Sequence, residues 1–172
     1  MPTIAVARPA PSRSAPALST EGPPPSAANV HDTRLFPHLL RLVAGNQFDT
    51  IYHEHFSYLS LYAVEQVFAA HGLALFDVEE LPTHGGSLRI YAGHAGHAPA
   101  ASERVLALRA EEAAAGVTNL SYYADFGERV RETKRKLLEF LIGARRAGKS
   151  VVGYGAPGKG NTLLNYCGIR TD

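Results

Sequence analysis

The first 30 residues restrict what this chain can fold into, because they cannot contribute to a packed core. The stretch MPTIAVARPAPSRSAPALSTEGPPPSAANV is dominated by Pro, Ala and Ser and shows neither helical nor strand periodicity. Such a composition cannot bury enough apolar surface to offset the entropy lost on ordering the chain. We therefore predict a disordered tail over residues 1–33, or fused or out-of-frame sequence, and a folded region that begins between Thr33 and Phe36.

The composition excludes several classes of protein. Charged residues make up 19% of the chain and the net charge is +1, which gives no electrostatic basis for binding nucleic acid or a membrane surface. No apolar run approaches the roughly 20 residues that a membrane-spanning helix needs. The single Cys167 rules out an internal disulfide framework and a multi-cysteine zinc site. A globular, cytoplasmic protein is expected.

Hydrophobic periodicity after the tail predicts an α/β domain. Helical patterns cover residues 37–44, 61–71, 100–115, 122–147 and 161–166, and strand patterns cover residues 73–78, 87–91 and 150–154. Residues 48–60 fit either a strand or an extended loop. The second helix is expected to turn four apolar side chains inward, namely Leu61, Val64, Val67 and Phe68.

The first polar cluster is Tyr52-His53-Glu54-His55, within FDTIYHEHFSY. The zinc-protease pattern H-E-x-x-H fails, because Ser57 stands where its second His is required, and no metal is expected here. A His has an unperturbed pKa near 6.5 and suits general acid–base work, with a neighbouring carboxylate or phenol to orient it. A polar loop that satisfies buried backbone groups is the structural alternative, and residue types alone leave both open.

The second cluster is the segment Thr83-His84-Gly85-Gly86-Ser87-Leu88-Arg89. Its Gly pair would let backbone N–H groups approach a ligand closely, and His84, Ser87 and Arg89 could hold hydroxyls or phosphate. A glycine-rich hairpin turn explains the same residues without any ligand.

The third cluster, GYGAPGKGN over residues 153–161, fits both the dinucleotide pattern G-x-G-x-x-G and most of the P-loop pattern. The P-loop requires Ser or Thr at its last position to hold Mg²⁺, and Gly160 stands there, which argues against an NTPase. What remains is a set of backbone donors and a helix N-terminus suited to phosphate or pyrophosphate.

Three segments together resemble the C-terminal part of the sugar C-methyltransferases, which act on nucleotide-linked deoxy-4-ketosugars. They are FDTIYHEHFSYLSL, GLALFDVEELPTHGGSLRIY and VVGYGAPGKGNTLLNYCGI, in the expected order. The resemblance implies that residues 34–148 form a catalytic-loop and helical region of an α/β C-terminal domain. Residues 149–172 would be the first β-α unit of a truncated Rossmann-like lobe. It also implies that the family's zinc-binding region and its S-adenosylmethionine domain are missing, so that a separate chain would have to supply the methyl donor.

The family's chemistry assigns roles to these residues. A base removes the proton beside the keto group, and the resulting enolate attacks the sulfonium methyl of S-adenosylmethionine. The resemblance makes His55 the base, with Tyr52 and Glu54 orienting it or stabilising the enolate. The sugar side would be lined by three residues, His84, Ser87 and Arg89.

The same resemblance places the nucleotide or its pyrophosphate against the glycine-rich loop. The residues expected there are Gly155, Lys159, Gly160 and Asn161, with Lys159 as the cation. Two other hypotheses stay open beside a C-methyltransferase: a nucleotide-sugar-binding module without catalysis, and a non-functional truncated gene product.

Overall fold

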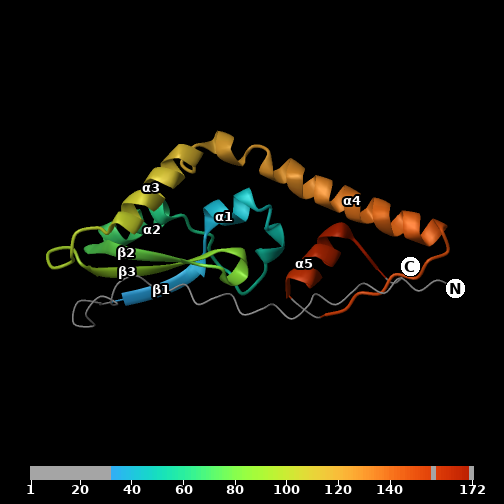
Figure 1. The fold of residues 1–172 in the computed structure, drawn as a ribbon, viewed down its shortest axis with the longest axis horizontal. Coiled ribbons are helices and arrows are strands. Elements are labelled where there is room, and N and C mark those ends of the chain that lie inside the picture. The colour runs from blue at the N-terminus through green and yellow to red at the C-terminus, as the bar shows by residue number, and fades with distance from the viewer. Residues whose placement is uncertain (1–31, 156–157, 171–172) are drawn as a thin grey trace.

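The structure is a computed structural model that describes residues 32–155 and 158–170. The predicted disordered tail lies almost wholly outside the described residues, so it stays a prediction. Figure 1 shows a small sheet with helices on one face, a long helix leading away from it, and a last helix lying back beside that long helix.

The sheet has three antiparallel strands in the order β1-β3-β2. They are β1 (Asp32–Pro37), β2 (Leu73–Leu81) and β3 (Ser87–His94). The expected hairpin is confirmed, with both strands longer than predicted. Its connection contains the short 3-10 helix η3 (Thr83–Gly85).

Strand β1 was not predicted, and the helix expected from residue 37 begins two residues later, as α1 (Leu39–Ala44). A Pro fits the first turn of a helix, but it also fits an edge strand, where its missing N–H breaks no ladder. Pro37 takes the second role and pairs with Ser87 at the start of β3.

Helices α2 (Leu61–Ala70) and α3 (Glu103–Ala115) cover one face of the sheet (Figure 1). Each begins at a Ser whose hydroxyl accepts a backbone N–H of the first turn, Ser60 for α2 and Ser102 for α3. Helix α3 ends at Gly116, in the left-handed conformation typical of a C-terminal cap. Both predicted helices are confirmed to within a few residues.

The core lies between this face and the two helices, as the strand periodicity requires. Its buried members are Leu61, Val64, Leu75, Val78, Leu88, Ile90, Ala92, Val105 and Leu108. Phe68 packs against this cluster as expected, but Val67 is 52% exposed and the prediction that it faces inward was wrong. Val67 stands three residues after buried Val64, at the edge of the apolar stripe, where the described part of the chain adds no second layer.

The rest of the chain forms an arm. The 3-10 helix η4 (Leu120–Tyr123) leads into α4 (Phe126–Arg146), and α5 (Gly158–Cys167) contacts both α4 and η2 (Phe48–Thr50). The predicted helix over 161–166 is confirmed and begins earlier. The predicted strand over 150–154 was wrong: no described strand pairs with this segment, and Val151 and Val152 are exposed. An apolar β-branched pair favours a strand only where a neighbouring strand accepts its hydrogen bonds.

None of the described helices is long and apolar enough to cross a bilayer. Among the described residues, no group of His, Cys, Asp and Glu is arranged to hold a metal ion.

Candidate active site

Side chains from three separate segments meet beside the hairpin turn. Tyr52 and His55 come from the loop after η2, His84 comes from η3, and Lys159 comes from the first turn of α5. The His55 ring centroid lies 5.0 Å from that of Tyr52 and 5.6 Å from that of His84, both in edge-on geometry. Lys159 Nζ lies 3.1 Å from the backbone oxygen of His84. The structure therefore brings together four of the residues selected from the sequence.

The His55 ring carries an unsatisfied group. Its Nε2 is buried and has no hydrogen-bond partner among the described residues. A buried polar atom without a partner costs free energy, and each such atom in a native fold needs an explanation. An unpaired imidazole nitrogen beside a phenol and a second imidazole has the chemistry of a proton acceptor.

Glu54 and His53 lie at the exposed side of the loop, where the His53 ring centroid is 6.1 Å from that of Tyr52. Both are exposed, and Glu54 forms no hydrogen bond or ion pair with any residue that the structure describes. Glu54 was expected to orient His55 or to stabilise the enolate, but no hydrogen bond joins the two described side chains. Tyr52 is the neighbour that contacts His55, through its ring and through its carbonyl, which accepts the His55 backbone N–H at 3.0 Å.

The turn that carries His84 is held in an unusual conformation. His84 has φ 56° and ψ 18°, a left-handed backbone that residues with a side chain rarely adopt. Three consecutive carbonyl oxygens each accept a hydrogen bond from a different side chain: Thr83 from Ser87 Oγ at 2.9 Å, His84 from Lys159 Nζ at 3.1 Å, and Gly85 from Gln47 Nε2 at 2.7 Å. The turn is therefore fixed from the sheet, from α5 and from the segment before η2.

The two glycines of the turn are explained by the protein itself. A Cβ on Gly85 would lie 2.5 Å from the side-chain oxygen of Gln47, and one on Gly86 would lie 2.9 Å from Arg41 Cβ. Both residues also have positive φ. The close approach expected of this Gly pair is thus to Gln47 and Arg41, as the hairpin-turn alternative supposes.

Two predicted sugar-side residues have partners within the fold. Ser87 is buried and donates its hydroxyl to Thr83. The Arg89 guanidinium lies 3.0 Å from Glu79 on the neighbouring strand, and its contacts with Tyr91 and Glu79 raise its pKa. None of these contacts joins Ser87 or Arg89 to His55.

The first turn of α5 lies against the Tyr52 ring. A Cβ on Gly158 would lie 3.6 Å from the Tyr52 ring, so α5 begins directly on that ring. Gly155 is exposed with φ 124°, Gly160 is partly buried, and Asn161 is exposed with its oxygen accepting from Asn165 at 3.1 Å. Residues 156 and 157 lie outside the described part of the chain.

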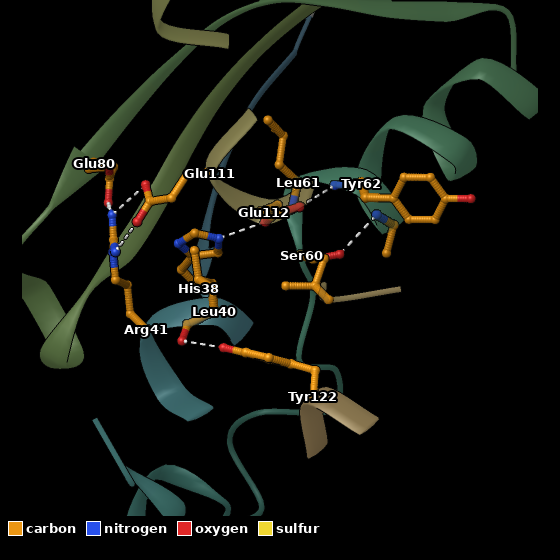
Figure 2. Close-up of polar contacts among 12 residues, drawn as sticks. His38, Leu40, Arg41, Ser60, Leu61, Tyr62, Glu80, Glu111, Glu112 and Tyr122 are labelled. Atoms are coloured by element: carbon orange, nitrogen blue, oxygen red, sulfur yellow. Dashed lines mark hydrogen bonds and ion pairs between the residues drawn. The ribbon is translucent and has the colours of Figure 1, made fainter. Parts of the chain in front are cut away.

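A buried pair at the start of α2 was not found from the sequence. His38 is 0% and Glu112 2% exposed, and His38 Nε2 donates to Glu112 at 2.7 Å. Glu112 also accepts the backbone N–H groups of Leu61 at 2.7 Å and Tyr62 at 2.9 Å, so it caps the N-terminus of α2 (Figure 2). A signal was present, because Glu112 follows Val105 and Leu108 on the inward stripe of α3.

The pKa of Glu112 reflects two opposed effects. Burial alone would raise it, but the hydrogen bonds from His38, Tyr62 and Leu61 outweigh burial and hold the pKa below its ordinary value of 4.5. Glu112 is therefore a carboxylate at neutral pH and holds α2, and with it the end of the His55 loop, in place.

The segment before α5 does not have the arrangement that the dinucleotide pattern requires. That pattern places its loop between a parallel strand and the helix that follows it. The described sheet is antiparallel, and residues 150–154 are not a strand.

Comparison with known proteins gives the family. Residues 82–172, more than half of the chain, match the C-methyltransferase C-terminal domain, and the chain belongs to this family. It is also similar to C-methyltransferase NovU of Streptomyces niveus, with 40% identity over 138 residues, which cover 77% of this chain and 32% of that protein. The chain thus spans about a third of the length of this curated relative. The family resemblance found in the sequence is confirmed at this level.

Proposed function

We propose that this chain provides the ketosugar side of a C-methyltransferase site, with His55 as the base that prepares the sugar carbon for methylation. The acceptor is a nucleotide-linked deoxy-4-ketosugar. The observation that supports the proposal most strongly is the buried, unpartnered Nε2 of His55, flanked by the rings of Tyr52 and His84.

In this proposal the proton on the carbon beside the keto group passes to His55 Nε2, with the imidazole N–H on Nδ1. The electron pair of the broken C–H bond forms the C=C bond of an enolate, and the former keto oxygen takes the negative charge. The Tyr52 hydroxyl donates a hydrogen bond to that oxygen. S-adenosylmethionine supplies the electrophilic methyl group when it is bound.

The nucleotide end lies over the first turn of α5. Lys159 has three N–H donors, and one of them is used on the His84 carbonyl, which leaves two for a diphosphate oxygen. The backbone of Gly155, Gly160 and Asn161 borders the same region. A helix N-terminus adds favourable electrostatics for an anion.

His84, Ser87 and Arg89 stay assigned to the sugar side, with different capacities. The His84 ring faces the cluster. The Ser87 hydroxyl already donates to Thr83 and keeps only acceptor capacity. Arg89 would have to share its contact with Glu79 in order to reach a hydroxyl.

Solvent exchange tests the proposal without a methyl donor. The purified chain is incubated in D₂O with a nucleoside-diphosphate-linked 4-keto-deoxyhexose, and the proton beside the keto group is followed by NMR against a protein-free sample. We expect the chain to accelerate exchange of that proton, with saturation in sugar nucleotide. Binding without acceleration would refute the catalytic role and favour the nucleotide-sugar-binding module.

A further inference from the structure

The His84 turn is held by more contacts than a hairpin connection needs. A two-strand hairpin is closed by its ladder and its turn hydrogen bond, here from the Gly86 N–H to the Thr83 carbonyl at 3.0 Å. The bonds from Gln47 and Lys159 are additional, and they come from outside the hairpin. They act on His84 and Gly85, two of the three turn residues whose backbone has positive φ.

The conformation that these bonds hold determines where the His84 ring points. A non-glycine residue in the left-handed region is strained, and it persists only where the surroundings enforce it. Relaxation of His84 toward negative φ would swing its Cβ and ring away from the edge-on contact with His55. The Gln47 and Lys159 bonds oppose that relaxation, because each fixes a carbonyl whose direction changes with the backbone rotation.

We propose that Gln47 and Lys159 are positioning residues, which clamp the 83–86 turn so that the His84 ring holds the His55 ring in its working orientation. The role as stated rests on the proposed function of His55. Lys159 would then hold the turn through the His84 carbonyl, in addition to its expected contact with phosphate. It also gives a role to Gln47, which no sequence pattern had selected.

The variants Gln47→Met and Lys159→Met test the clamp, because each removes the donor and keeps an unbranched side chain. Lys134→Met is the matched control: Lys134 also donates to a backbone carbonyl of α5, that of Tyr166 at 3.2 Å, but at the far end of the helix. Ring signals of ¹⁵N-labelled His55 and His84 are recorded for each variant, together with kcat and KM for α-proton exchange.

We expect Gln47→Met to lower kcat for exchange by about 10- to 100-fold with KM nearly unchanged, as loss of orientation does. The His84 and His55 ring signals should shift in both clamp variants and stay unmoved in Lys134→Met. Since both bonds hold one turn, the double variant should lose less than the product of the two single losses.

Two results would overturn the proposal. The first is unchanged ring signals and unchanged kcat in both clamp variants. The second is a Lys159→Met variant that changes KM alone while Gln47→Met is silent, which would make Lys159 a ligand contact only. Failure of the proposed function would give a different result. The wild-type chain would then not accelerate proton exchange, but the ring signals of His55 and His84 would still report whether Gln47 and Lys159 hold the turn. Gln47→Glu, which keeps the side-chain shape and loses the donors, replaces Gln47→Met if that variant does not fold.

Discussion

Replacing Glu112 with Gln tests whether the buried His38–Glu112 pair holds α2 in place. The wild-type carboxylate accepts three hydrogen bonds, two at one oxygen from His38 and Leu61, and one at the other oxygen from Tyr62. A Gln amide offers one acceptor oxygen and one NH₂ group. If the oxygen keeps His38 and Leu61, the NH₂ faces the Tyr62 N–H, and two donors then meet in a buried site.

The expected cost follows from that mismatch. A hydrogen bond to a charged group contributes about 1.5–3 kcal/mol net, and leaving a buried donor unpaired costs about 1–3 kcal/mol. We therefore expect Glu112→Gln to lower the free energy of unfolding by about 2–4 kcal/mol. Glu112→Ala, which strands all three donors, should cost about 3–5 kcal/mol, as breaking a buried pair does. A domain of this kind is stable by only about 5–15 kcal/mol in total.

Glu111→Gln is the matched control. Glu111 is the preceding residue on α3, its side chain is 44% exposed, and it pairs with Arg41 at the surface (Figure 2). Such a pair contributes about 0–1 kcal/mol. Urea unfolding followed by circular dichroism gives both free energies, and amide exchange should be faster at Leu61 and Tyr62 in Glu112→Gln alone. Equal losses in the two variants would refute the capping role of Glu112.

The pH dependence gives a second check on Glu112. Its folded pKa lies below the ordinary value of 4.5, so its stabilising contribution is complete above 4.5 and is lost as the pH falls through the lower folded pKa. The stability gap between wild type and Glu112→Gln should therefore narrow as the pH falls below 4.5. A gap that stays constant from pH 7 to the acid limit of folding would contradict the assignment.

Three further predictions concern other parts of the fold. Gly86→Ala should destabilise the chain by about 1–3 kcal/mol in urea unfolding, because the new Cβ would contact Arg41 and the Ala would have to adopt a strained backbone. An unchanged free energy of unfolding would mean that the turn is free to relax. Burial raises the pKa of Cys167, although Lys134 acts in the opposite direction. Iodoacetamide should therefore label this thiol slowly until urea unfolds the chain, and rapid labelling of the folded chain would contradict its burial. Asp77→Asn should lower the free energy of unfolding by about 1–3 kcal/mol in the same assay, since Asp77 is buried and paired with Arg104. A loss of stability below about 0.5 kcal/mol would mean that water replaces the ion pair.

Local signals in the sequence were sufficient for the hairpin and for most helices. Ser102 and Gly116 mark the two ends of α3, and the alternating apolar residues of β3 mark its inward face. The errors arose where a local signal depends on a distant partner. Pro37 fits a helix start or an edge strand, and only pairing with β3 decides between them. The Val151-Val152 pair resembles a strand, but no described strand lies beside it.

The candidate site was predicted only in part for the same reason. His55 and His84 are 29 residues apart in sequence, and no spacing rule joins them; the family resemblance selected both, and the fold places their rings together. Glu112 was missed because an acidic residue in a Glu- and Ala-rich helix usually faces solvent. Gln47 acts through a backbone carbonyl, and a contact of that kind has no sequence signature.

The most direct test of the central claim compares His55→Ala with His53→Ala in α-proton exchange. The two histidines are two residues apart, and the His53 side chain is exposed, which makes His53→Ala a close control. Loss of a general base typically lowers a rate by about 10²–10⁴-fold. We predict a loss of this size in kcat for His55→Ala, with sugar-nucleotide affinity nearly unchanged, and little effect in His53→Ala. A His55→Ala chain that exchanges the proton as fast as wild type would show that another residue is the base.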